Sequence, residues 1–480
     1  MNCPTLPLRT ASALRVLLLA VLLWARPHAL ATEPETELEP VIDAASLIEP
    51  ALLSGPGFNV DAHVELRGYM AHFRLDTRLG PMQAPSVEIL AEREAELPAL
   101  ELLDAATHSQ AFIDAASDRL LQTAHSLANI ALHPIDTVTG VPLGVARFLR
   151  DKLVRYGDQA QSLSDHAARR LGSSGNPWQA SAGPMTEARH GDDSDAPPRQ
   201  RKTWLTRISR EGERWVKREL KYNTVKRDLA RRLGIDPYSG NPLVQERLSS
   251  LAWIGSAGNF SAGKALDAVG GVGAQVLAQG GHIDEVVWRL SPDDLRARNA
   301  QRLQSVCRDE FLIRQFLRRG AFTPTLQTAL VDHLQTLQPE SGCDLFLELA
   351  MTAQGELEAR FLANGLGLIA SHLGARARGG QLLTIGAGFA WRTRDGEIVL
   401  PLAVDRLSWT VQAARFFTQP ALREGQRSVL IDGDASVMAL RELRQLGWRV
   451  TTHAPRAHAP PYARKSDTAS DSSTRVEMPE

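Results

Sequence analysis

The spacing of apolar residues changes along the chain, and each spacing predicts a different kind of element. Between His63 and Gly80 apolar and polar residues alternate, which predicts a strand or a hairpin, with Ser86–Glu94 as a possible partner strand. From Leu97 onward apolar residues recur every three or four positions, as on one face of an amphipathic helix. Residues 61–171 are therefore predicted to combine a β-hairpin with helices.

The helical spacing continues through the middle of the chain, over residues 201–378. Residues 201–234 predict a basic amphipathic helix, or a pair of helices, that ends at Gly234. Further on, Thr323 followed by Pro324 is typical of a helix start, because threonine caps the first amide groups and proline suits the first helical position. This region is predicted to be a helical domain.

A different pattern begins near residue 379. Two apolar runs, Gln381–Trp391 and Glu397–Val404, flank Asp395-Gly396, a dipeptide that suits the tight turn of a β-hairpin. The runs that follow predict, in order, a helix, a strand, a helix and a last strand, at residues 406–417, 428–434, 435–447 and 448–454. This end of the chain therefore predicts a small α/β unit of the β-α-β kind.

Together these patterns predict an α+β protein that is predominantly helical, with an N-terminal hairpin, a helical middle and a small α/β end. The predicted segments are a signal peptide (1–31), an extended acidic leader (32–60), a hairpin-plus-helices domain (61–171), a disordered linker rich in Gly, Ser, Pro and Asp (172–200), a helical domain (201–378), the α/β unit (379–454) and a disordered tail (455–480).

The first residues have the features of a secretory signal peptide. Arg9 and Arg15 precede an apolar run of about ten residues, Val16–Ala25, and residues 29–31 match the small-x-small pattern of a cleavage site. The run is too short to span a bilayer, which takes roughly twenty residues, and no later segment reaches that length. We therefore expect an exported protein, periplasmic in a bacterium or secreted, whose mature chain begins near Thr32 and is soluble or peripheral to a membrane.

Export affects how the cysteines are interpreted, and the net charge limits the expected partners. Cys3 precedes the apolar run, which leaves Cys307 and Cys343 in the mature chain. In an oxidising compartment such a pair can form a disulfide, and two buried free thiols are the alternative. The formal net charge of −1 provides no overall attraction to nucleic acid.

Residues 258–265, GNFSAGKA, partly match two motifs and complete neither. Lys264 has the spacing of a phosphate-binding loop, but Ala265 stands where that loop needs a hydroxyl for Mg²⁺. Ser261 and Lys264 have the spacing of serine acyl-transferases such as penicillin-binding proteins, but the later elements of those enzymes are missing. Residues 270–275 lack the third glycine of a dinucleotide loop, and no histidines have metal-site spacing. No cofactor and no metal ion are therefore predicted.

The stronger chemical candidate is DGDAS, residues 432–436, which follows a predicted strand and precedes a predicted helix. This arrangement resembles the first motif of the haloacid dehalogenase superfamily. The resemblance implies Asp432 as nucleophile toward phosphate, Asp434 as general acid and base, Mg²⁺ between them, and Thr451 or Thr452 as a phosphate ligand. It is confined to this short segment, without the later lysine and acidic motifs of such sites. The alternative is a polar turn in which Asp434 or Ser436 caps the helix.

A basic stretch follows the predicted linker. Its cationic residues recur at helical spacing and alternate with apolar ones: Arg207, Arg210, Arg214, Lys217, Arg218 and Lys221. Such a helix could lie on an anionic membrane surface or meet an acidic envelope partner, whereas nucleic acid is not expected outside the cytoplasm. The alternative is a solvated helix whose arginine stems cover the core.

Two functions from different classes remain. The first is a non-enzymatic binding or scaffold protein of the cell envelope that uses the basic helix. The second is a metal-dependent, phosphatase-like hydrolase centred on Asp432 and Asp434. Both carboxylates in a pocket with a third acid or a lysine would favour the hydrolase.

Overall fold

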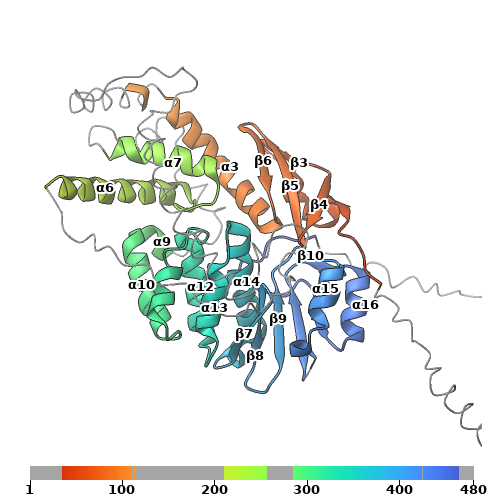
Figure 1. The fold of residues 1–480 in the computed structure, drawn as a ribbon. Coiled ribbons are helices and arrows are strands. Elements are labelled where there is room, and N and C mark those ends of the chain that lie inside the picture. The colour runs from red at the N-terminus through yellow and green to blue at the C-terminus, as the bar shows by residue number, and fades with distance from the viewer. Residues whose placement is uncertain (1–34, 110–111, 115–209, 257–284, 424, 464–480) are drawn as a thin grey trace, which may run out of the picture. The chain divides into compact units, whose positions relative to one another are not determined.

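Figure 1 shows the computed structural model of the chain, which describes residues 35–109, 112–114, 210–256, 285–423 and 425–463. These residues form a mixed α+β protein, as the sequence predicts. Several predicted features lie outside the described residues: the signal peptide, the linker at 172–200, the motif-like segments at 258–265 and 270–275, and Arg207.

An antiparallel sheet of six short strands begins the described chain. Its strands are β1 (Val41–Asp43), β2 (Ser54–Gly55), β3 (Phe58–Val60), β4 (His63–Arg67), β5 (Met70–Thr77) and β6 (Gly80–Ala84), and a short helix, α2 (Pro50–Leu53), precedes β2. The strand order is β1-β4-β5-β3-β2, with β6 also paired to β5. The alternation that predicts a hairpin is β4 and β5, and Val64 and Leu66 are buried while their neighbours in β4 are exposed.

The pattern of Ser86–Glu94 predicts a strand, but this segment begins the helix α3 (Val87–Thr107). The Ser86 hydroxyl accepts a hydrogen bond from the Ile89 amide at 3.1 Å and caps the helix. Pro98 lies on the exposed side of α3, and the helix continues through it. The short apolar run is compatible with the two-residue period of a strand and with the 3.6-residue period of a helix. The cap at Ser86 and the packing of the segment stabilise the helix.

The predicted helical middle is divided between two apolar cores. The helices α6 (Arg210–Leu233) and α7 (Pro242–Gly255) pack on each other, and α7 packs on α3. They share one core with the N-terminal sheet, to which Leu75, Leu100 and Leu248 contribute. The helices between residues 292 and 373 belong to a second core instead.

That second core joins five helices to the C-terminal sheet. The helices are α10 (Pro292–Gln304), α11 (Glu310–Phe316), α12 (Pro324–Leu337), α13 (Cys343–Met351) and α14 (Glu356–Leu373). The short helix α9 (Glu285–Arg289) precedes them, and its Trp288 packs against the first core. As predicted, Thr323 caps α12 by accepting from the Leu326 amide, with Pro324 at the first helical position. Because this core also includes residues of the sheet, the helices and the α/β unit are packed as one body.

The C-terminal sheet has five strands in the order β13-β11-β9-β8-β7. These are β7 (Gln381–Ile385), β8 (Gly388–Arg392), β9 (Ile398–Leu402), β11 (Arg427–Ile431) and β13 (Arg449–Thr451); α15 (Val411–Phe417), α16 (Val437–Gln445) and the two-stranded pair β10 (Arg406–Leu407) and β12 (Asp434–Ala435) complete the unit. The predicted Asp395-Gly396 turn joins β8 to β9, and Gly396 has a positive φ of 86°. Strands β9, β11 and β13 are parallel, so their carboxyl ends lie at the same edge of the sheet.

Residues 455–463 belong to the segment whose composition predicts a disordered tail, but they pack in ordered contacts. We call residues 452–463 the C-terminal segment. Tyr462 forms a β-bridge with Ile48, and the Ala463 amide donates to the Leu47 carbonyl at 2.9 Å. The buried Tyr462 side chain holds a segment whose Pro and Ala content by itself gives no sign of order.

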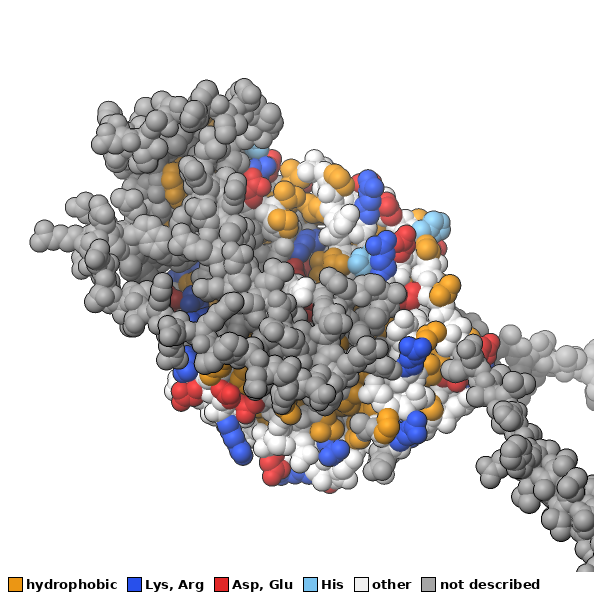
Figure 2. Space-filling model, viewed as in Figure 1, with side chains coloured by type: hydrophobic (Ala, Val, Ile, Leu, Met, Phe, Trp, Pro, Cys, Tyr) orange, Lys and Arg blue, Asp and Glu red, His pale blue; other side chains and the backbone are white. Residues whose placement is uncertain are grey.

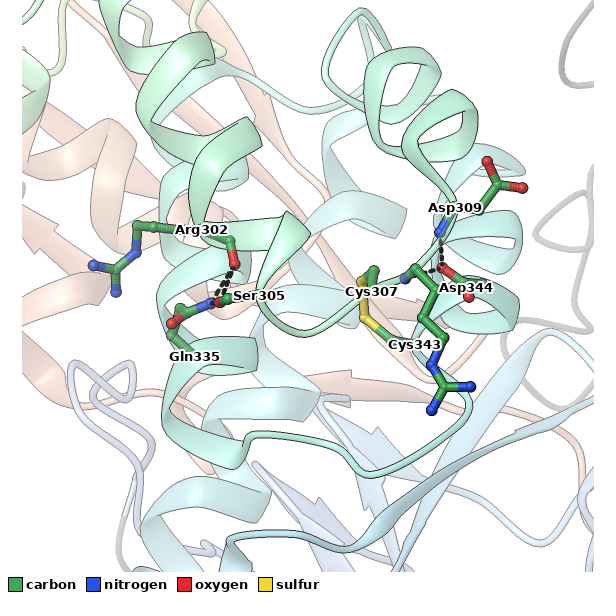
Figure 3. Close-up of a disulfide and its surroundings, with 8 residues drawn as sticks. Arg302, Ser305, Cys307, Asp309, Gln335, Cys343 and Asp344 are labelled. Carbon is green, nitrogen blue, oxygen red and sulfur yellow. Dashed lines mark hydrogen bonds between the residues drawn. A yellow bond between two sulfur atoms is a disulfide. The ribbon is translucent and has the colours of Figure 1, made fainter.

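Cys307 and Cys343 form a disulfide, as one of the two sequence hypotheses holds (Figure 3). It connects the residues just after α10 to the start of α13, and the two cysteines are 36 residues apart in sequence. Beside it, the Asp344 carboxylate accepts hydrogen bonds from the Arg308 and Asp309 amides, both at 3.0 Å. On the chain-entropy model, closing a loop of this length stabilises the fold by about 3–4 kcal/mol.

None of the described helices is both long enough and apolar enough to cross a membrane. In Figure 2, basic and acidic side chains are interspersed over the visible described surface.

Candidate functional site

The carboxyl edge of the parallel strands gathers buried charged groups. Asp405 follows β9, Asp432 follows β11, and Arg456 lies in the C-terminal segment after β13. Asp405 is 2% exposed and Asp432 is 4% exposed. Parallel pairing places these side chains together although they are far apart in sequence.

Asp405 joins three parts of the chain through its carboxylate. It accepts hydrogen bonds from the Ala71 amide in β5 at 2.9 Å, from the Val87 amide at the start of α3 at 3.2 Å, and from the Tyr462 hydroxyl at 2.9 Å. Burial raises the pKa of Asp405 to about 7 in spite of these hydrogen bonds. This residue therefore sets where α3 begins relative to the C-terminal sheet.

Arg456 bridges the sheet to α3. Its Nε and Nη2 donate to both oxygens of Asp432 at 2.9–3.1 Å, and Nη2 also donates to Glu88 at 2.6 Å. Burial raises the pKa of Asp432, and Arg456 opposes that effect. A guanidinium shared by two carboxylates has the fork geometry that arginine provides and lysine does not.

From Glu88 a row of charged and polar side chains continues between α3 and α14, which we call the polar seam. Its members are Glu88, Glu92, Arg93 and Glu96 of α3 and Glu356, Arg360 and Asn364 of α14. Arg360 binds Glu88 at 2.7 Å, Glu356 at 2.6 Å and also Glu92, and Arg93 binds Glu356 at 3.3 Å. Because the low-numbered end of α3 contacts the high-numbered end of α14, the two helices run antiparallel along the seam.

The carboxyl groups of the seam differ in how easily they ionise. Burial alone would raise the pKa of Glu88, but Arg456 and Arg360 together lower it below its ordinary value. Burial raises the pKa of Glu92 to about 7, with the carboxylates of Glu96 and Glu356 adding to the rise and Arg360 opposing it. Burial also raises the pKa of Glu96, although Ser239 and Asn241 donate hydrogen bonds to it. Burial and the neighbouring arginines therefore shift the pKa values of adjacent carboxyls in the seam in opposite directions.

Next to the seam lies a cavity of about 470 Å³. Its walls are formed by α3, the loop between α6 and α7, α12, α14 and the C-terminal segment. Six carboxyl-bearing residues line it, Glu88, Glu92, Glu94, Glu96, Asp236 and Glu356, together with the two arginines Arg360 and Arg456. A cavity of this size with convergent polar groups is typical of a small-molecule site.

Other ionisable groups at the cavity are also shifted by burial. The pKa of Asp236 is raised to about 6 by burial, and the hydrogen bond from the Tyr238 amide opposes the rise. The pKa of His333, which lines the cavity, is lowered to about 4 by burial and by Arg456. Behind the wall, burial lowers the pKa of Lys226 to about 8. Such a group of shifted residues at a cavity is a physical indication of a functional site.

Both aspartates of the DGDAS segment that the hydrolase hypothesis uses form ion pairs with arginines of the protein. Asp432 pairs with Arg456, whereas Asp434 pairs with Arg406 at 3.3 Å. Between them, a Cβ on Gly433 would lie 2.0 Å from the Asp405 carbonyl oxygen, so only glycine fits there. Ser436 caps α16 by accepting from the Ala439 amide at 2.9 Å, as the alternative interpretation holds.

The requirements of the hydrolase hypothesis are met only in part. Other acids, Glu88 and Asp405, do lie near Asp432. However, the neighbouring cations are arginines that already pair with the carboxylates. In the part of the chain that the structure describes, no three His, Cys, Asp or Glu side chains are placed to hold a metal ion.

The basic residues from Arg210 to Lys221 lie in α6, so the predicted helix is present. Lys221 is exposed. The side chains of residues 210–220 lie outside the described ones. Contact of this helix with an anionic membrane surface or an acidic partner stays a prediction.

Sequence reasoning did not find the polar seam, although a signal was present. Glu88, Glu92 and Glu96 are spaced by four residues, and so are Glu356, Arg360 and Asn364. Such a stripe on a single helix ordinarily faces solvent. Only the fold shows that the two stripes face each other and that Arg456 joins them.

Stability is expected to fall as the pH rises from about 6.5 to 7.5. Glu92 and Asp405 have a pKa of about 7 in the folded protein, above the unfolded value near 4, so folding becomes less favourable as they ionise. Each group contributes a slope of up to about 1.4 kcal/mol per pH unit. The lowered pKa of His333 makes stability rise with pH, but only below the ordinary histidine pKa of 6.5.

Urea unfolding across this pH range measures the effect. Glu92→Gln, which resembles the protonated side chain, should make the decline shallower. A decline of unchanged slope in this variant would show that Glu92 does not ionise in this range.

Scans against protein-family models and searches of curated proteins and of solved structures find no match to this chain.

Proposed function

We propose that this chain is an exported, non-enzymatic protein of the cell envelope that binds a small polar ligand in the cavity beside the polar seam. The observation that carries the proposal is a cavity of about 470 Å³ whose walls combine apolar side chains with six carboxyls and two arginines. Apolar walls exclude water from a ligand, and a few fixed polar groups orient it.

The arrangement of the seam favours binding over catalysis. Arg360 and Arg456 hold Glu88 from two sides, and Arg93 and Arg360 hold Glu356. These carboxylates are directed at arginines of the protein rather than at a common reacting atom. Side chains fixed in this way provide a preorganised surface for a ligand.

The export part of the proposal has separate support. The disulfide between Cys307 and Cys343 is the kind of bond that persists in oxidising compartments and is rare in the cytosol. It agrees with the signal-peptide features of the first residues.

Filling the cavity is expected to abolish ligand binding. Ala329 of α12 lines the cavity, and Ala329→Phe would place a ring in it. The purified full chain would be exposed to a mixture of small polar metabolites, and retained compounds would be identified by native mass spectrometry. We expect the wild-type chain to retain at least one compound that Ala329→Phe does not.

The matched control is Ala300→Phe, at a partly buried alanine of α10 that does not line the cavity. It should retain the same compound as the wild-type chain. Equal retention by Ala329→Phe and wild type, or no retention by either, would disprove the proposed site.

A further inference from the structure

We propose, on the basis of the function proposed above, that the ligand of this cavity is a small organic cation, with an amine or guanidinium group on an apolar body. The first reason is the balance of charge in the cavity wall. Its lining holds six carboxyls against two arginines. Even with Arg93, which lies just behind and pairs with Glu92, Glu96 and Glu356, the acids outnumber the arginines.

The second reason is the balance of hydrogen-bonding capacity. Arginine has donors only, and a carboxylate has acceptors only. The donors of Arg360 are directed at Glu88, Glu92 and Glu356, and those of Arg456 at Asp432, Glu88 and the His458 carbonyl. Because these arginine donors already have partners, the hydrogen-bonding groups that remain for a ligand in the cavity are mainly the acceptor oxygens of the carboxylates. A ligand that donates hydrogen bonds and carries positive charge matches it.

The third reason separates an organic cation from a metal ion. The cavity is much larger than a bare ion and has apolar walls that include Leu52, Ile235, Leu326 and Pro461. Among the described side chains, no carboxyls and histidines converge closely enough to coordinate a metal ion. An amine that carries a hydrocarbon chain would satisfy the acceptors at one end of the cavity and the apolar wall along its length.

A consequence is that binding is coupled to proton release. Glu92 and Asp236 have pKa values raised to about 7 and about 6, mainly by burial, and a bound cation favours their ionised forms. The other titratable groups at or behind the wall are Glu88, Glu94, Glu96, Glu356, His333, His458 and Lys226. With a pKa of about 4, His333 stays neutral above pH 5.5 and adds no competing charge. Affinity for a cation should therefore rise between pH 5.5 and pH 7.5.

Three probes of equal length and different charge test the inference: cadaverine, 1,5-pentanediol and glutarate. Titration calorimetry on the full chain should show binding of cadaverine and not of the other two. Glu92→Gln should weaken cadaverine binding at pH 7.5 by about tenfold to a hundredfold, because a charged hydrogen bond is lost. It should also make the pH dependence of the affinity shallower.

Glu101→Gln is the matched control, because Glu101 is also on α3 but does not line the cavity. It should leave cadaverine binding unchanged. The inference would be overturned if pentanediol or glutarate bound as tightly as cadaverine. It would also be overturned if the wild-type chain retained only neutral or anionic metabolites that Ala329→Phe loses. In either case the proposed function would stand. Retention of no metabolite at all would instead disprove the proposed function itself.

Discussion

Replacing Arg360 with methionine is expected to lower the free energy of unfolding by about 4–5 kcal/mol, because it would leave buried carboxylates without their shared cation. Arg360 is 14% exposed and binds Glu88, Glu92 and Glu356. Methionine has a similar length and keeps the packing of the stem, so the loss reports mainly on the charge. Urea unfolding followed by circular dichroism measures the change.

The matched control is Arg314→Met in α11. Arg314 also pairs with a glutamate four residues earlier, Glu310, but both side chains are more than half exposed. An exposed pair of this kind contributes about 0.3–0.5 kcal/mol. If the two variants lost similar stability, the seam would contribute no more than a surface ion pair. Arg360→Lys should recover only part of the loss, because an ammonium cannot make the same set of forked contacts.

Replacing Asp405 with alanine is expected to cost about 4 kcal/mol or more, since three donors would be left unsatisfied in the interior. The amides of Ala71 and Val87 and the Tyr462 hydroxyl all donate to this carboxylate. Each buried donor without a partner costs about 1–3 kcal/mol. Hydrogen exchange should show the loss of protection concentrated at the start of α3 and in the C-terminal segment.

Asp309→Ala provides the control for this change. Asp309 also accepts two backbone hydrogen bonds, from Phe311 and Leu312, but it does so at the exposed start of α11. Water can replace it there, so the cost should be about 1 kcal/mol, as for other helix caps. Uniform loss of protection in Asp405→Ala would indicate general destabilisation rather than release of the elements that Asp405 joins.

Asp432 and its two partners show why the candidate site was only partly predictable from the sequence. Asp432 is a candidate in the sequence because it follows a strand and precedes a helix, and the structure does place it at the carboxyl edge of the sheet. Its partner Arg456 lies in a segment whose composition predicts disorder. Its neighbour Glu88 lies in a segment whose short apolar run predicts a strand, whereas it belongs to α3. The partners were therefore missed for local reasons, although the acid itself was found.

The helices of the middle region are divided between two apolar cores. Composition and periodicity group residues 201–378 as one helical region, but α6 and α7 share a core with the N-terminal sheet while α10–α14 share a core with the C-terminal sheet. Both sets of helices have an apolar face, and such a face does not specify its partner. Long-range packing makes that choice.

The sequence by itself determined the features that depend on neighbouring residues. These are the β4–β5 alternation, the cap at Thr323 and Pro324 and the Asp395-Gly396 turn, and each depends on contacts within a few positions of the chain. The pairing of Cys307 with Cys343 was one of two hypotheses, and the fold decided between them.

Only the tertiary structure decided the polar seam and the cavity. The free energy of a charged side chain depends on whether water or a partner surrounds it, and that depends on residues far away in sequence. Two polar stripes that would each suit solvent become a buried network because α3, α14 and the C-terminal segment meet there.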